Sequence, residues 1–230
     1  MIKLINITIA LTMLWSCAKK NDSLVAYWDF DNVENNMVKD LSDNGYHAIV
    51  HDAVFDEGKI GKAFHGDGKG YLEVKYNPAL DKFEQGITIA AWVCRDTSTL
   101  WNCLITRETQ DNWSEYYDIA INKNKPLFSI DPDGKNFVKA EHSDSLPVGQ
   151  WIHLAGTFDN KTYKLYINGK EAASGMKEMP FVFTDQNPIY IGSNTNDAGA
   201  TMHDYFFGKI DELKIYNRAL NNEEILTLTK

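Results

Sequence analysis

Two stretches of the chain combine aromatic rings with amide and charged side chains. The first runs from Leu100 to Tyr117 and the second from Ser193 to Tyr205. Pyranose rings present apolar CH faces that stack on aromatic side chains, and their hydroxyl groups need polar partners held in place. We therefore predict a sugar-binding surface formed by Trp101, Arg107, Asn112, Trp113, Tyr117, Asn194, Asp197, His203 and Tyr205. The alternative for Trp101 and Trp113 is that each covers an open edge of the fold.

Motifs for catalysis are absent from the sequence. No predicted strand carries the Glu-x-Asp-x-x-Glu spacing that would place paired carboxylates on one face, as a retaining glycosidase requires. A Gly-x-Ser-x-Gly elbow, a phosphate loop and a His-Glu-x-x-His helix are also missing. We expect a binding protein that is not an enzyme, with a protein-binding adhesion or assembly module as the first alternative and a glycoside hydrolase as the second.

The elements that must position these residues are short strands. Residues Gly86–Cys94 alternate apolar and polar side chains, and so do Trp151–Phe158 and Thr162–Asn168, which a polar break at 159–161 joins into a predicted hairpin. Asn168-Gly169 predicts a second tight turn. Helical signals are confined to Pro78–Asp81 and to a tail that Asn221 or Asn222 could cap. The pattern predicts an all-β protein, either a two-sheet sandwich or a barrel.

A succession of motifs resembles a known family. In order along the chain they read LVAYWDFDN, DLSDNGYHA, GKIGKAFHGDGKGYLEV, ITIAAWV, LPVGQWIHLAGTFD, YKLYINGK, IYIG and GKIDELKIYNRALNNEEI. This order is similar to that of the laminin G-like, concanavalin A-like jelly-roll domains, in particular the bacterial set related to the pentraxins. The resemblance implies one antiparallel two-sheet jelly-roll domain over residues 24–230, with a glycan or a cell-surface protein as its partner.

The same resemblance implies a structural calcium ion where the chain ends meet. Asp31 and Asp211 would supply carboxylate or carbonyl oxygens, and Gly66, in a predicted Gly-Asp-Gly turn, would supply a carbonyl oxygen. The alternative is that these residues serve their own turns and neighbouring amides.

The N-terminus has the composition of an export signal. Residues 1–16 carry one lysine, an apolar run and no acidic residue. Leu14-Trp15-Ser16-Cys17 resembles the lipobox of bacterial lipoproteins, which implies lipidation of Cys17, a linker over 17–23 and an outer-membrane location. An ordinary cleaved signal is the alternative.

Charge and cysteine content add two expectations. The formal net charge of −9 argues against nucleic acid as a partner. Cys94 and Cys103 lie close in sequence, and export would favour a disulfide between adjacent strands. Two half-buried thiols are the alternative.

Overall fold

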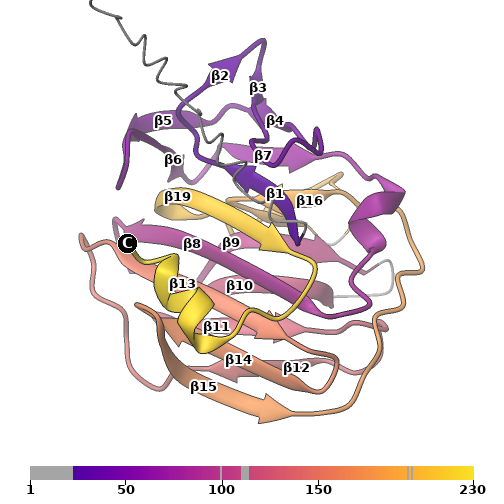
Figure 1. The fold of residues 1–230 in the computed structure, drawn as a ribbon. Coiled ribbons are helices and arrows are strands. Elements are labelled where there is room, and N and C mark those ends of the chain that lie inside the picture. The colour runs from indigo at the N-terminus through magenta and orange to yellow at the C-terminus, as the bar shows by residue number, and fades with distance from the viewer. Residues whose placement is uncertain (1–22, 99, 110–113, 196, 198) are drawn as a thin grey trace, which may run out of the picture.

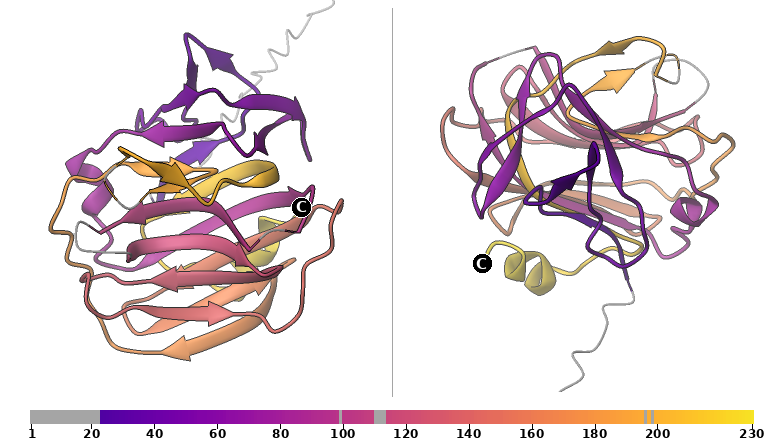
Figure 2. Two further views of the ribbon diagram at one scale, coloured as in Figure 1. Left: turned by 180° about the vertical axis from the view of Figure 1, so that it is seen from behind. Right: turned by 90° about the horizontal axis from the view of Figure 1, so that it is seen from above.

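The computed structural model describes residues 23–98, 100–109, 114–195, 197 and 199–230. The candidate signal segment and Cys17 lie outside these residues. Two antiparallel sheets stack face to face (Figures 1 and 2), which confirms the predicted sandwich. No helix in the described part of the chain is long and apolar enough to span a membrane.

Sheet I is the eight-stranded layer on which the C-terminal helix lies (Figure 1). Its strands run in the spatial order β15 (Lys170–Met176), β14 (Thr162–Ile167), β13 (Ile152–Phe158), β8 (Ile87–Arg95), β19 (Phe207–Tyr216), β6 (Lys62–Asp67) and β5 (Val54–Glu57), with β1 (Leu24–Trp28) also paired to β19. The first and last strands of the domain are therefore neighbours.

Sheet II is the nine-stranded layer behind it (Figure 2). Its order is β12 (Val138–Glu141), β11 (Lys125–Ile130), β10 (Glu115–Asn122), β9 (Trp101–Glu108), β16 (Ile189–Ile191), β7 (Tyr71–Val74), β4 (Ala48–His51), β3 (Met37–Val38) and β2 (Val33–Glu34). A separate two-stranded hairpin is formed by β17 (Asn194–Thr195) and β18 (Met202–His203).

The turns and helices follow the sequence signals. Asn168 and Gly169 have φ of 50° and 77°, the left-handed conformation that the β14–β15 reversal requires. The predicted helical turn is a 3₁₀ helix, η1 (Pro78–Asp81). The C-terminal helix α1 (Asn222–Thr227) starts with a capping box, in which the Asn221 side chain accepts the amide of Glu224 and the Glu224 side chain accepts the amide of Asn221.

The main core fills the space between the sheets. Side chains such as Trp28, Phe64, Phe128 and Leu154 are completely buried there. A smaller cluster lies on the outer face of sheet I, where Ile225 of α1 and neighbouring side chains cover Ala90 and Ala155. Helix α1 therefore covers part of the outer face of sheet I (Figure 1). The outer face of sheet II is the opposite surface of the sandwich.

Candidate functional site

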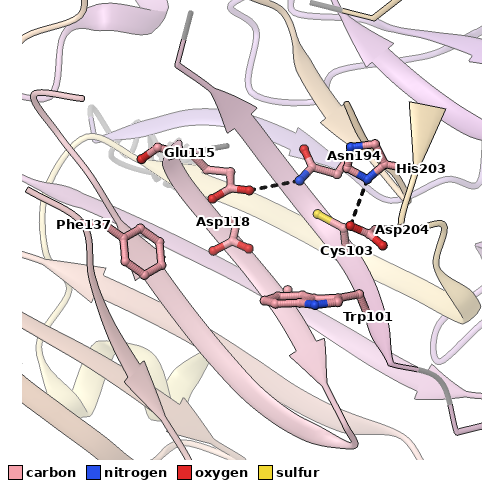
Figure 3. Close-up of a pocket in the computed structure, with 10 residues that line it drawn as sticks. Trp101, Cys103, Glu115, Asp118, Phe137, Asn194, His203 and Asp204 are labelled. Carbon is pink, nitrogen blue, oxygen red and sulfur yellow. Dashed lines mark hydrogen bonds and ion pairs between the residues drawn. The ribbon is translucent and has the colours of Figure 1, made fainter. Parts of the chain in front are cut away.

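A pocket of about 630 Å³ opens on the outer face of sheet II. Trp101 and Phe137 stand on two sides of Glu115 and Asp118, while Asn194 reaches in from the β17–β18 hairpin (Figure 3). Trp101 is 41% exposed and Phe137 is 48% exposed, so both rings are accessible to a ligand. The lining residues are Trp101, Cys103, Ser114, Glu115, Asp118, Ala120, Phe137, Asn194, His203 and Asp204.

An irregularity in β10 brings the two carboxyl groups to the same face. A residue three positions from another on a regular strand points to the opposite side. The pairing of β10 with β9 shifts register between Glu115 and Tyr117, which is the mark of a β-bulge. As a result, Tyr116 and Tyr117 both enter the core, while Glu115 and Asp118 both line the pocket. Strand alternation does not predict that Glu115 and Asp118 share a face, because the bulge breaks the period of two.

The β17–β18 hairpin supplies the polar wall. It is attached to β9 by the amide of Cys103, which donates to the carbonyl of Asp204 at 3.1 Å. The Asn194 amide donates to Glu115 Oε1 at 3.0 Å and so fixes the orientation of that carboxyl group. His203 Nδ1 lies 2.9 Å from Asp204 Oδ2. Asn194 and His203 were predicted from the sequence, and the structure brings them to the same pocket as Trp101.

A tight loop before β12 holds Phe137. Asp131 Oδ1 accepts the amide of Asn136 at 2.7 Å, and Asp133 Oδ1 accepts the amide of Lys135 at 3.0 Å. Gly134 has φ of 70° in this turn. The loop is thus fastened by its own aspartates. Sequence reasoning missed Phe137 because it adjoins neither of the two aromatic and polar stretches.

Three carboxyl groups in and beside the pocket, those of Glu115, Asp118 and Glu108, have raised pKa values. Burial raises the pKa of Glu115, although the hydrogen bond from Asn194 partly offsets that rise. Burial and the neighbouring Glu115 raise the pKa of Asp118 well above its usual range. Glu108, which pairs across the strands with Glu115, has a pKa of about 8 because of its burial and the charges of Glu115 and Asp197. Burial is the largest cause for all three groups, since a poorly solvated carboxyl group resists ionisation.

Two predicted sugar ligands are buried, and those predictions are wrong. Arg107 is fully inaccessible and forms a 2.7 Å ion pair with Asp81 Oδ1 of η1. Its guanidinium also lies 4.4 Å from the ring centre of Phe183. Tyr117 is equally inaccessible, and burial raises its pKa to about 12. Both side chains are fully buried, so neither can contact a ligand at the surface.

The other predicted ligands fall outside the pocket lining or outside the described residues. Asp197 is exposed and holds its own loop, since its Oδ1 accepts the Thr201 amide at 2.7 Å. Tyr205 is partly buried and interacts electrostatically with Tyr71. Asn112 and Trp113 lie outside the described residues.

The residues expected to hold calcium have structural contacts. Asp211 Oδ2 accepts the amide of Ile60 at 2.9 Å and its Oδ1 accepts that of Glu212 at 2.7 Å, while Asp31 Oδ1 accepts the amide of Lys62 at 2.6 Å. Asp31 and Asp211 thus clamp the β5–β6 turn onto the ends of the domain. Burial raises the pKa of Asp211 to about 6.

Gly66 does not lie in the predicted turn but inside β6, opposite Gly208 of β19. A Cβ atom there would lie 2.1 Å from the Phe206 carbonyl oxygen, which explains why the position is glycine. The described residues contain no group of three or more His, Cys, Asp or Glu side chains placed to hold a metal. Calcium at Asp31, Gly66 and Asp211 stays a prediction, which melting in a chelator would test.

Cys94 and Cys103 are free thiols, so the predicted disulfide is wrong. Cys94 lies in β8 of sheet I and Cys103 in β9 of sheet II. Cys103 lines the pocket, and Cys94 alternates with the core residue Val93, so the two side chains point out of opposite faces of the sandwich. Closeness in sequence does not bring the two cysteines together, because the consecutive strands β8 and β9 belong to different sheets.

A second groove of about 740 Å³ lies beside α1 on sheet I. Its two basic side chains are engaged in ion pairs, with Lys164 at 2.8 Å from Glu171 and Arg218 at 2.6 Å from Glu224. Tyr166 lines it, but that ring is buried and donates to Asn222 at 2.8 Å. The groove therefore lacks the accessible aromatic rings of the sheet II pocket.

A family model described as the concanavalin A-like lectin/glucanases superfamily matches residues 66–226. The chain belongs to this superfamily. Pappalysin-1 from Mus musculus is 29% identical to it over 90 residues, and pappalysin-1 from Homo sapiens is 28% identical over the same length. Each match covers 37% of this chain and 5% of the relative, so the chain spans only a small part of the length of these relatives.

Solved structures resemble this lectin-like fold over nearly the whole chain. Domain 4 of AbnA, a GH43 extracellular arabinanase from Geobacillus stearothermophilus solved with arabinotriose, has a TM-score of 0.72 and 23% identity, covering 90% of this chain and 98% of that one. The binding domain of Paraclostridial Mosquitocidal Protein 1 has a TM-score of 0.71 and 18% identity, covering 92% and 52%. Likenesses at this level of identity show the fold.

Proposed function

We propose that this domain binds carbohydrate, without cleaving it, in the pocket on the outer face of sheet II. The observation that carries the proposal is the pair of accessible rings, Trp101 and Phe137, on two sides of oriented polar groups. A ring stacked against a sugar face contributes affinity, and fixed hydrogen-bonding groups select the hydroxyl pattern.

The similar structures support this choice of ligand class. The AbnA domain was solved with arabinotriose, and a related structure of botulinum neurotoxin type C concerns its interaction with two ganglioside molecules. A saccharide complex is therefore known for one domain that has this fold over nearly its whole length. The pocket volume of about 630 Å³ lies within the range of about 300–1,000 Å³ that is typical of small-molecule sites.

Screening on a glycan array tests the proposal, with every positive glycan then titrated by calorimetry. We expect saturable binding with a stoichiometry of one sugar chain per protein. An array without positives, followed by pull-down of a protein ligand whose binding survives Trp101→Ala, would instead support the adhesion or assembly alternative.

Glycoside hydrolysis is a second candidate, favoured by the shared face of Glu115 and Asp118. Hydrolysis needs one protonated and one ionised carboxyl group at the working pH. Here burial raises the pKa values of both groups, which favours the protonated acid and disfavours the ionised partner. We therefore expect no new reducing ends when the protein is incubated with its ligand. Release of reducing ends that Glu115→Gln abolishes would establish the hydrolase instead.

Anchoring at the bacterial envelope completes the proposal. The lipobox-like sequence before Cys17 would place the domain on a membrane through a lipid, with the pocket directed to external or periplasmic glycans. Mass spectrometry of the N-terminal peptide tests this part. A lipid-modified Cys17 supports it, and an unmodified cysteine in the membrane fraction contradicts it.

A further inference from the structure

We propose that the pocket on sheet II selects sugars with a free amino group over neutral sugars and rejects uronic acids. This inference rests on the proposed carbohydrate binding and specifies its ligand. Three carboxyl groups, those of Glu115, Asp118 and Asp204, line the cavity, and no lysine or arginine is among the described residues that line it. The charge of the ligand is therefore the property that these walls can distinguish.

The nearby basic groups are already paired. The ammonium group of Lys139 lowers the pKa of Asp118 slightly against a larger rise from burial, but it forms an ion pair with Glu141. The imidazole of His203 lies against Asp204. Glu115 has an amide partner, Asn194, and Asp118 has a hydroxyl partner, Ser129. Neither partner carries a charge. The basic groups that act on the pair, His203 on Glu115 and Lys139 on Asp118, already have carboxylate partners in Asp204 and Glu141.

An ammonium group from the ligand would correct this imbalance. A positive charge beside a buried carboxyl group favours its ionised form, so an ammonium group placed beside Glu115 and Asp118 would offset the cost of ionising them in the pocket. The face of Trp101 also attracts a cation that approaches it. A sugar with an unsubstituted amine offers both features, because its ring can stack while its ammonium group reaches the carboxyl groups (Figure 3).

A uronic acid would meet the opposite situation. Its carboxylate would enter a pocket that already holds three acidic groups, and like charges at short distance in a poorly solvated site repel strongly. A neutral sugar lies between the two cases, since it can stack and hydrogen-bond without any charge interaction. The expected order of affinity is amino sugar, neutral sugar, uronic acid.

Calorimetric titration with three matched trisaccharides tests this order. The probes are the trimers of glucosamine, N-acetylglucosamine and galacturonic acid, at about pH 6 where the amine is protonated. We expect the glucosamine trimer to bind at least about tenfold tighter than the acetylated trimer and the galacturonic acid trimer not to bind measurably. Equal affinity of the first two, or binding of the acidic trimer, would overturn the inference. If no glycan of any charge binds, either here or on the array, the proposed function itself fails.

Substitutions of the pocket carboxyl groups test whether these groups cause the preference for the amino sugar. Glu115→Gln should remove the preference for the amino sugar while binding of the acetylated trimer persists, and Asp118→Asn should do the same if the glutamate variant is unstable. Glu178→Gln, an exposed glutamate that is not among the lining residues, is the matched control and should leave the order unchanged. A preference that survives both pocket substitutions would contradict the assignment to these carboxyl groups. Binding of trilysine as tight as that of the glucosamine trimer would show that the pocket reads charge and not sugar.

Discussion

Glu108 and Glu224 lie on opposite sides of the sandwich, and their pKa values are displaced in opposite directions. Glu224 has a pKa of about 2 because Arg218 and the amide of Asn221 donate hydrogen bonds to it. Glu108 has a pKa of about 8 because it is buried near Glu115 and Asp197. One residue type thus behaves as a stable anion beside α1 and as a neutral acid beside the pocket.

The difference separates a structural face from a candidate binding face. On sheet I, cations are paired with acids, and α1 covers apolar side chains with its own. On sheet II, three carboxyl groups line a pocket whose described lining contains no lysine or arginine, and two aromatic rings remain accessible. A fold gains nothing in stability from such a cluster, because ionising a group there costs free energy. That cost is typical of a site kept for a ligand.

Among the proposed variants, Glu108→Gln should give the largest change in folding stability. A carboxyl group whose pKa is raised in the folded state destabilises the fold as pH rises from about 4.5 to about 8, because the unfolded chain releases its proton more readily. The amide variant should lose that dependence and be more stable than the parent by up to about 5 kcal/mol above pH 8, because each pKa unit corresponds to about 1.4 kcal/mol, with little difference near pH 4. Thermal melts of both proteins across this range measure it. Parallel curves would show that Glu108 ionises normally.

Trp101→Ala tests whether the accessible ring serves a ligand. Loss of one stacking surface should weaken sugar affinity at least about tenfold, or about 1.4 kcal/mol, while the melting temperature stays near that of the parent. The exposed residue Met176, on the outermost strand of sheet I, provides the control Met176→Ala, which should bind normally. Equal affinity of the parent and the tryptophan variant would place the sugar elsewhere.

Asn221→Ala tests the structural role of the opposite face. It removes the side chain that caps α1 and should cost about 1 kcal/mol of unfolding free energy. Sugar affinity should not change, because α1 lies on sheet I and the pocket on sheet II. Denaturant melts and calorimetry on the same sample measure both quantities. A substantial loss of affinity would mean that the two faces are coupled.

Reduction is expected to have no effect on stability. Cys94 and Cys103 are free thiols on opposite faces, so a thiol reductant has no bond to break between them. Melts of the protein with and without reductant should coincide, and peptide mapping after alkylation should find both cysteines labelled. A lower melting temperature under reduction, with a peptide linking the two, would contradict the structure.

The fold could be predicted because its signals are local. Alternating strands, the Asn168-Gly169 turn and the Asn221 cap each act through neighbours in sequence, and the structure confirms them. Only part of the candidate site could be predicted from the sequence. Trp101, Asn194 and His203 were found because their surroundings are polar, whereas Arg107 depends on an acidic partner, Asp81, that lies far from it in sequence.

Two further features need three-dimensional information. The pairing of Glu115 with Asp118 comes from a β-bulge, which shifts side chains between faces without any sequence signal that alternation could detect. Phe137 reaches the pocket through a loop that joins strands β11 and β12. The cysteine pair fails for a related reason, because consecutive strands of a sandwich can belong to different sheets.

A crystal structure of the protein with its tightest-binding oligosaccharide tests the central claim most directly. We predict a sugar ring stacked on Trp101 or Phe137, with a hydroxyl or amino group within hydrogen-bonding distance of Glu115. A sugar bound in the groove beside Arg218, with nothing between the two aromatic rings, would contradict the assignment of function to sheet II.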